Sequence, residues 1–386
     1  MNTTAESQDF VPWKISKFAE TILIILYFLI TFIAISGNGI VCYLVFAYKR
    51  MHTVPNYFIF NLALSDILVA IFCIPFSFVA NLKNYWPFGV AMCPVVMYSQ
   101  GVTVFLSSYT LVAMSIDRYF VIVHPFLRRI TTRQTVFVIM AIWVISLAIP
   151  LPALLKSQIL YFSNTSGQCL EIWSNNTDKY RYSLALMVLH YFGPLAILIF
   201  SYSKIGFNIW IKNFHGDEGN KRRLQLAAAK QKMIRMMITV VVFYALCWLP
   251  IHTVTLIGDQ HPSIYNLPMM PVLWMLFHWL AMSNSCYNPI IYIWMSPKFR
   301  TGLKLSFQRC TRRRSLQQQP SDDNLNVKPE DVAKKKTVYC CLLEDKRRRF
   351  HDGYTPYRLS HCAYPPPPRL MPLDRLRLSA SIHSDT

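Results

Sequence analysis

The sequence predicts an all-α protein: a seven-transmembrane helix bundle with a short membrane-parallel eighth helix and a disordered C-terminal tail. Hydrophobic residues make up 53% of the 386 residues and charged residues only 15%, whereas soluble proteins carry about 25% charged residues. Seven apolar runs each reach the length of about 20 residues that a helix needs to cross a bilayer. The net charge of +20 lies between and after these runs. This pattern excludes a soluble two-domain enzyme.

The seven runs define the membrane domain, which we expect over residues 21–310, after an N-terminal segment of residues 1–20. They are residues 21–48, 57–82, 90–116, 134–155, 182–203, 236–257 and 270–295. Asp66 is the only formally charged residue inside them. The runs are too long for barrel strands of about ten residues. No small-residue cleavage site precedes the first run, so we expect an uncleaved first helix.

Lysine and arginine placement predicts the orientation, because basic residues are enriched in cytoplasmic loops. With the N-terminus outside, the exterior carries only six of the 39 basic residues: Lys14, Lys17, Lys83, Lys156, Lys179 and Arg181. The remainder face the cytoplasm. The basic charge therefore indicates topology and a surface facing anionic lipids, and nucleic-acid binding is a poor explanation.

Two features of the exterior agree with this orientation. The N-x-S/T acceptor triplets at Asn2, Asn164 and Asn175 all fall outside and predict glycosylation. Of the ten cysteines, only Cys93 and Cys169 lie at the outer edge, where oxidation is favoured. A disulfide between them would tie the second outer loop to the third helix. The alternative is two free thiols.

The chain after the seventh run changes character. Residues 298–309 alternate large apolar and basic side chains and predict an amphipathic eighth helix on the inner leaflet. Cys310 follows as a palmitoylation candidate. Residues 311–386 contain basic runs and the stretch Pro365–Pro368, which are typical of a disordered cytoplasmic tail.

One motif per helix makes the chain resemble a rhodopsin-like G-protein-coupled receptor over about residues 20–310. In order along the chain, the motifs are Gly37-Asn38, Asn61-Leu62-Ala63-Leu64-Ser65-Asp66, Trp86-Pro87-Phe88-Gly89 before Cys93, Asp117-Arg118-Tyr119, Trp143, Pro194 with Tyr202, Cys247-Trp248-Leu249-Pro250 and Asn288-Pro289-Ile290-Ile291-Tyr292. A single tripeptide of this kind means little, but the ordered set is specific.

The resemblance implies an activation switch built from Asp117, Arg118, Tyr119, Tyr202, Trp248, Pro250, Asn288, Pro289 and Tyr292. At rest Arg118 would pair with Asp117, and in the active state it would turn toward Tyr202, Tyr292 and the G protein. Pro250 and Pro289 interrupt backbone hydrogen bonds and create bends in their helices. The alternative for Arg118 alone is a side chain that reaches lipid phosphates.

An ionisable residue at bilayer depth is costly and by default indicates function. The resemblance implies no organic cofactor and an allosteric sodium ion near Asp66, Asn38, Ser107, Asn284, Ser285 and Asn288. These oxygens suit a hard cation. The alternative is a neutral Asp66 that is hydrogen-bonded to asparagine side chains.

Three residues depart from the family pattern. Tyr244 lies one turn below Trp248, where many relatives have phenylalanine. Ser108 replaces an aliphatic residue of the third helix, and Lys230 stands where some relatives carry an acid that holds Arg118. The last departure predicts appreciable basal activity.

The absence of two characteristic residues narrows the candidate ligand classes. Gln100 stands where the amine receptors carry Asp, and Met282 stands where retinal-binding relatives carry Lys. The polar residues left around the expected pocket are Gln100, His190, His252, Thr255, Asp259, Trp274 and His278. With the run from His278 to Pro289, they resemble neuropeptide Y-type receptors and their invertebrate RYamide and luqin relatives. The resemblance implies a peptide whose arginine binds Asp259 and whose amidated end lies near Gln100 and His278.

The expected protein is therefore a non-enzymatic receptor at the plasma membrane. Its expected partners are an extracellular peptide, a heterotrimeric G protein, an arrestin, a receptor kinase and the lipid bilayer. There are alternatives to these ligand-binding roles. Asp259 could be a solvated loop acid, and each histidine could be an ordinary packed residue. A receptor for luqin or a tachykinin-like peptide is a second interpretation. A transporter, which would show internal repeats, and an intramembrane enzyme, which would show a serine or zinc motif, are less consistent with the sequence.

Overall fold

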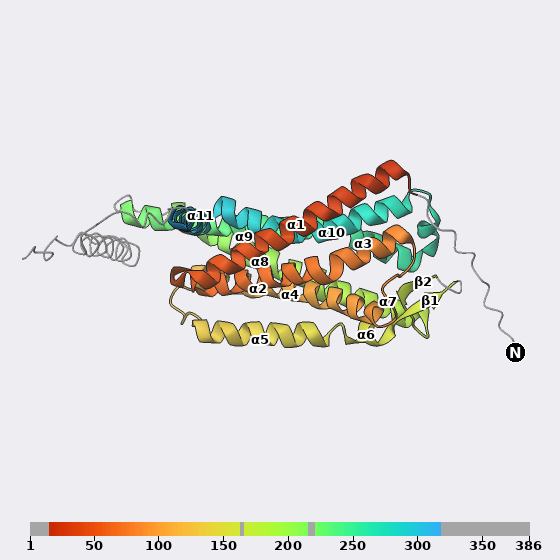
Figure 1. Ribbon diagram of the computed structural model, residues 1–386. Helices are drawn as coiled ribbons and strands as arrows, with labels where there is room; N and C mark the ends of the chain where they lie inside the picture. The colour runs from red at the N-terminus through yellow and green to blue at the C-terminus, as the bar shows by residue number, and fades with distance from the viewer. Residues whose placement is uncertain (1–14, 163–165, 215–220, 318–386) are drawn as a thin grey trace, which may run out of the picture. The chain divides into compact units, whose positions relative to one another are not determined.

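The computed structural model describes residues 15–162, 166–214 and 221–317. Figure 1 shows long helices side by side, with the strands β1 and β2 at the end of the bundle where α1 begins. The described elements in chain order are α1 (Lys17–Ala47), α2 (Val54–Leu68), α3 (Ile74–Lys83), α4 (Met92–Val123), α5 (Thr132–Ala148), α6 (Leu151–Lys156), β1 (Ser157–Tyr161), β2 (Gly167–Glu171), α7 (Asn176–Met187), α8 (Gly193–Phe214), α9 (Lys221–Gln260), α10 (Met270–Met295) and α11 (Pro297–Gln317).

Six of the described helical segments are long and apolar enough to cross a membrane: Lys17–Ala47, Val54–Lys83, Met92–Val123, Thr132–Lys156, Asn176–Ile209 and Gln231–Gln260. The predicted seventh span is α10, which packs against α1, α2 and α9 but is not among those six. Its buried His278, Asn284 and Asn288 lower its hydropathy. These polar residues face the protein interior, so α10 completes the bundle despite its composition.

Two spans contain a π-helical turn that the apolar pattern did not predict. Residues Val69–Cys73 join α2 to α3, and residues Val188–Phe192 join α7 to α8. In the second turn the Gly193 N–H bonds to the carbonyl of Val188, five residues back. A π turn widens the helix and is frequent at functional sites.

The end of the bundle where α1 begins, which the sequence predicts to face outside and which we call the outer end, carries a two-stranded antiparallel sheet that the all-α prediction missed. Strands β1 and β2 pair in the register Ser157↔Glu171 to Tyr161↔Gly167. The predicted disulfide between Cys93 and Cys169 is present, with the two Cα atoms 5.6 Å apart. It fastens β2 to the start of α4, and the Trp86 N–H donates to the carbonyl of Gly167 at 2.8 Å. The hairpin is therefore held over the outer end of the bundle.

The inner end continues from α10 into α11 with one intervening residue, Ser296. Phe299 is almost fully buried and stacks on Tyr292, with ring centroids 5.9 Å apart. Phe307 on the same helix is exposed. This division fits the predicted amphipathic helix, although α11 runs to Gln317 and so passes the expected boundary at residue 310. The rest of the predicted tail lies outside the described residues.

Close packing between α1 and α10 depends on a glycine. A Cβ atom at Gly37 would lie 2.8 Å from Cγ of Pro289, whereas a Cβ atom at Gly39 would meet nothing within 4 Å. The two glycines are neighbours on α1 but face different surroundings. The contact at Gly37 places α1 directly against the proline bend of α10.

We expect Gly37→Ala to destabilise the protein by about 1–3 kcal/mol, because the added methyl group overpacks a rigid contact with a proline ring. Thermal unfolding of the detergent-solubilised protein measures this effect. Gly39→Ala is the matched control and should leave the unfolding temperature unchanged or slightly raised. Equal destabilisation by both changes would contradict the role of the Pro289 contact.

Candidate functional site

The inner end of α4 carries the charged pair that the sequence predicts. Arg118 Nε donates to Asp117 Oδ2 at 2.8 Å, and an Arg118 Nη2 hydrogen bond goes to the same oxygen. Both residues are buried, and Arg118 Nη1 also contacts Met233 Sδ at 3.8 Å. A buried guanidinium needs such a partner, since an uncompensated charge there would be very costly.

Tyr202 and Tyr292, two other residues of the predicted switch, make no hydrogen bond to this pair. The hydroxyl groups of Tyr202 and Tyr292 are buried and have no hydrogen-bond partner among the described residues. Arg118 is therefore directed at Asp117, as expected for the resting arrangement. The side chain of Lys230 lies outside the described residues.

Asp66 lies fully buried where α2 meets α10. Its Oδ2 accepts a 2.8 Å hydrogen bond from Asn288 Nδ2, and Ser285 also interacts with this carboxylate. Its Oδ1 has no partner in the described part of the chain, and neither does the buried Oδ1 of Asn38. Two acceptor oxygens are thus left without donors in a low-dielectric interior.

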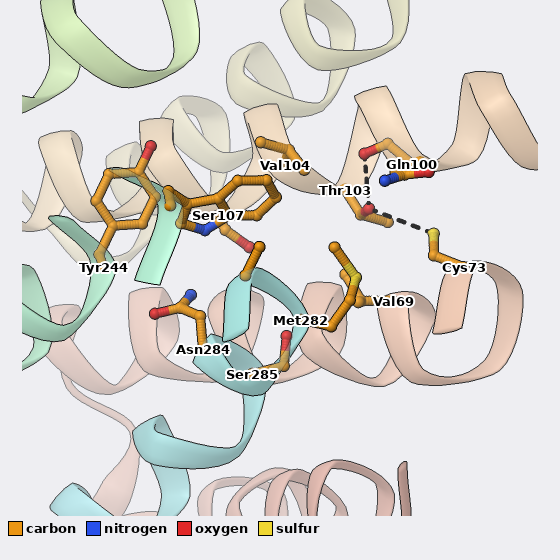
Figure 2. Close-up of a pocket in the computed structure, with 12 residues that line it drawn as sticks. Val69, Cys73, Gln100, Thr103, Val104, Ser107, Tyr244, Met282, Asn284 and Ser285 are labelled. Carbon is orange, nitrogen blue, oxygen red and sulfur yellow. Dashed lines mark hydrogen bonds between the residues drawn. The ribbon is translucent and has the colours of Figure 1, made fainter. Parts of the chain in front are cut away.

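Ser107, Asn284 and Ser285 line one end of a small cavity (Figure 2), and Ser285 also interacts with Asp66. Ser107 Oγ is 2.8 Å from Ser65 Oγ. The cavity has a volume of about 10 Å³, which is enough for roughly one water molecule. Its lining also includes Gln100, Trp248 and Met282. Gln100 lies toward the opposite end of the cavity from Tyr244 in Figure 2. The cavity therefore has in its lining both Gln100, a predicted ligand residue, and Ser285, which interacts with Asp66.

Two of the predicted ligand histidines form a pair between the fifth and sixth spans. The Nε2 atoms of His190 and His252 are 3.0 Å apart, and His190 Nδ1 is 2.7 Å from the carbonyl of Leu186. Because that carbonyl only accepts, His190 carries its proton on Nδ1, and His252 donates to the free Nε2 of His190. His252 stacks on Trp248, with ring centroids 5.5 Å apart. The pair thus rests directly on the predicted switch tryptophan.

The third histidine is elsewhere. His278 Nδ1 is 2.9 Å from the hydroxyl of Tyr27, which itself donates to the carbonyl of Met275. Tyr27 has only one proton, so Nδ1 of His278 must be the donor in their bond. Its buried Nε2 is then an acceptor, and it has no partner in the described residues. The sequence analysis did not identify Tyr27, because an isolated tyrosine in an apolar helix carries no signal.

The remaining predicted ligand residues line the outer part of α9 and α10. Thr255 bonds to its own helix through the Ile251 carbonyl, and the Trp274 ring lies edge-on to Tyr265 at 6.1 Å. Asp259 is half-buried at the end of α9, with no ion pair within 4 Å in the described part of the chain. The next residue, Gln260, donates to the Tyr180 hydroxyl at 3.0 Å.

Glu171 is an acid that the sequence analysis counted but did not assign. It is half-buried at the end of β2, where its Oε2 accepts a 3.0 Å bond from the Trp173 indole. Burial raises the pKa of the Glu171 carboxyl, and the charge of Asp259 adds to the rise, while Trp173 and Lys179 oppose it. The two acids therefore share one electrostatic environment. Only the folded hairpin brings residues so distant in sequence together.

The predicted modification sites are only partly described. Asn175 is exposed and caps α7, where its side-chain oxygen accepts from the Thr177 N–H at 3.0 Å. That bond leaves the amide nitrogen, which carries the sugar, unused. Asn2, Asn164 and the side chain of Cys310 lie outside the described residues.

Comparison with known proteins agrees with this geometry. The family model described as 7 transmembrane receptor (rhodopsin family) matches residues 37–292. An RYamide receptor of Drosophila melanogaster is 42% identical over 312 residues, which cover 78% of this chain and 67% of that protein. An RYamide receptor of Tribolium castaneum is 41% identical over 289 residues, or 72% of this chain and 78% of that protein. A substance-K receptor of Homo sapiens is 34% identical over 313 residues, or 80% and 77%.

The family match covers more than half of the chain, and it ends at Tyr292 of the predicted switch. The motifs that resembled this family in the sequence lie within the bundle described above. The predicted disulfide and the buried Asp117–Arg118 pair are in place. The chain therefore belongs to the rhodopsin family of seven-transmembrane receptors.

Proposed function

We propose that this protein is a plasma-membrane receptor, with its N-terminus outside, that binds a C-terminally amidated neuropeptide of the RYamide type and activates a heterotrimeric G protein. The observation that carries this proposal is its similarity to two insect RYamide receptors over more than 70% of the chain. The positions of Asp259, Gln100 and His278 support the same ligand class. The basic residues concentrated at the predicted cytoplasmic end, opposite the ligand residues, support an orientation with the N-terminus outside.

The outer acids fit an arginine of the peptide. Asp259 has no cation within ion-pair distance in the described part of the chain, and its field reaches Glu171. A guanidinium arriving between α9 and the hairpin would gain from both carboxylates. Arginine is suited to this role because it stays charged and presents a planar fork of donors to a carboxylate.

The histidine on α10 fits the amidated end. His278 Nε2 is a buried acceptor without a donor, so it can accept an N–H from a terminal carboxamide. A free peptide carboxylate has no such N–H and would bring a second acceptor and a charge into the same place. Gln100, with a donor and an acceptor on one amide, would complete recognition of the carboxamide.

Asp259→Asn should move the dose–response curve of an Arg-aromatic-amide peptide to about 10- to 100-fold higher concentration, because a desolvated charged pair is worth a few kcal/mol. Calcium and cyclic AMP responses of transfected cells measure the shift. Asp178→Asn is the matched control, since Asp178 is also an outer acid but faces Arg181 at 3.8 Å.

The outcomes of this experiment test the peptide class of the ligand separately from its contact with Asp259. Equal responses of wild type and Asp259→Asn would remove the Arg–Asp259 contact but keep the peptide class. Silence of the wild type across the peptide panel, with surface expression confirmed, would remove the ligand assignment.

The free-acid form of an active peptide should be weaker by about 100-fold or more, because it leaves the His278 acceptor unpaired and desolvates a charge. A displacement assay with labelled amidated peptide compares the two forms directly. His278→Phe removes the acceptor and should narrow the difference between amide and acid. An unchanged amide-to-acid ratio in this variant would exclude His278 as the discriminating residue.

We also propose the allosteric sodium ion near Asp66. The fit rests on the two orphaned oxygens, Asp66 Oδ1 and Asn38 Oδ1, with Ser107, Asn284, Ser285 and Asn288 close by. Oxygen ligands suit a hard cation. Bound sodium would balance the negative charge of the Asp66 carboxylate. The hydrogen bond from Asn288 orients this carboxylate.

If Asp66 binds sodium, NaCl should lower affinity for the labelled agonist peptide in wild-type membranes, whereas choline chloride at equal ionic strength should not. Asp66→Asn removes the charge and should abolish the difference between the two salts. The measurement is equilibrium binding, so it does not depend on coupling. The same response to sodium and choline in the wild type would reject the ion site.

A second candidate ligand is a tachykinin-like peptide, because the chain is also 34% identical to a substance-K receptor. A luqin-like peptide would share the arginine and the amidated aromatic end of the first candidate. Peptides with and without an arginine before the terminal aromatic amide distinguish the two. A preference for the arginine-free series, unaffected by Asp259→Asn, would favour the second candidate.

Further partners follow from the receptor class. Phosphorylation of the tail by a receptor kinase would add charge that recruits an arrestin. Glycans on Asn2, Asn164 and Asn175 and a palmitoyl group on Cys310 complete the proposed mature protein. Mass spectrometry of the purified receptor tests these modifications.

A further inference from the structure

The fifth and sixth spans are joined by polar contacts below the ligand pocket. The hydroxyl of Tyr244 on α9 donates to the backbone carbonyl of His190. The hydroxyl of Tyr191 donates in the opposite direction, to the carbonyl of Ala245 at 2.8 Å. The His190–His252 pair lies above them. We call the bonds of Tyr244, Tyr191 and His252 the α8–α9 seam.

The His190 carbonyl, which Tyr244 binds, lacks its usual donor within the helix. In an α-helix the carbonyl of His190 would accept from the N–H of residue 194, and residue 194 is proline, which has none. The π turn at Val188–Phe192 also shifts the local pattern, as the Gly193-to-Val188 bond shows. An unbonded carbonyl inside a membrane protein is costly. The tyrosine hydroxyl thus replaces a missing backbone donor.

Tyr244 is one of the residues that depart from the family pattern, and Ser108 is another. Both are fully buried, and their side chains interact. The Ser108 hydroxyl donates to the Phe105 carbonyl at 3.2 Å, and the Phe105 ring packs edge-on to His190. A phenylalanine at position 244 could fill the same space but could not donate to His190. The departure therefore adds one directional bond between α8 and α9.

We propose that Tyr244 is a positioning residue that holds α9 against α8 in the resting receptor, and that signalling requires its bond to the His190 carbonyl to break. The bond occurs in the arrangement in which Arg118 is paired with Asp117. Pro250 lies just above Tyr244 in α9 and provides the bend about which the inner part of the helix moves. Movement of α9 away from this turn separates the hydroxyl from a carbonyl whose ordinary i+4 donor is missing because residue 194 is proline.

The energetic consequence is a shift between two states. A bond made only in the resting state lowers the active fraction without ligand, and a peptide must supply the free energy to break it. Removing the bond therefore raises basal signalling and agonist potency together, by up to the same factor. A side chain needed only for packing would instead lower the number of folded receptors and change neither quantity in that direction.

The test compares Tyr244→Phe with Tyr98→Phe. Tyr98 makes the same kind of bond, from its hydroxyl to the carbonyl of Leu147 at 2.8 Å, but it joins α4 to α5 and is remote from α9. Ligand-free and peptide-stimulated signalling is measured and divided by surface receptor number. We expect Tyr244→Phe to raise basal signalling about three- to tenfold and lower the half-maximal peptide concentration severalfold, as loss of one net hydrogen bond implies. Tyr98→Phe should match the wild type.

A second measurement covers the case in which Tyr244→Phe reaches the surface poorly. Purified receptor in lipid nanodiscs is mixed with G protein, and ligand-free nucleotide exchange is measured per mole of purified receptor. A rate above wild type supports the proposal. A rate equal to or below wild type overturns it, and so does an equal rise in Tyr98→Phe, which would indicate general loosening of the bundle. Because this readout needs no bound peptide, it remains valid if the RYamide assignment fails.

Discussion

The structure depends on one constraint: inside a bilayer, every buried polar group must find its partner within the protein. Most do so in the described part of the chain, and half of the exceptions lie where the family places its function. Asp66 and Asn38 each have an unpaired oxygen, Tyr202 and Tyr292 have unpaired hydroxyls, and His278 has an unpaired nitrogen. Polar atoms of Ser146, Ser157, Tyr182, Asn208 and Trp279 are also unpaired in the described part of the chain, and no function proposed for the protein accounts for them. Unpaired atoms that are grouped around a cavity or a charged pair are the informative ones.

Proline creates the complementary problem, a carbonyl without a donor. Pro194 leaves His190 in this position, and Tyr244 on the neighbouring helix supplies the donor. A break in one helix is therefore repaired by another helix, and the repair links the two. Such a hydrogen bond differs from an apolar contact, because it depends on direction and is lost over a short displacement. Polar repair of a helix break thus turns a local defect into a two-state element.

The sequence predicted the spans, the disulfide and the Asp117–Arg118 pair, because each depends on composition or on a motif with fixed spacing. It missed the π turns, since a single extra residue per turn leaves an apolar run unchanged. It missed the hairpin because β1 and β2 are only five residues long each. Tyr27 and Glu171 were missed for a common reason: each acquires its role from residues more than 80 positions away, His278 and Asp259.

The departures from the family pattern bear on one another. Lys230 stands where some relatives carry an acid that holds Arg118, so the sequence lacks that acidic partner. Tyr244 and Ser108 add polar contacts nearer the middle of the bundle. A resting state needs only a sufficient sum of interactions that the active state lacks, and their location along α9 is free to vary. The loss near Arg118 and the gain near His190 therefore act in opposite directions on the same equilibrium. Basal activity reflects their balance, so neither substitution alone determines it.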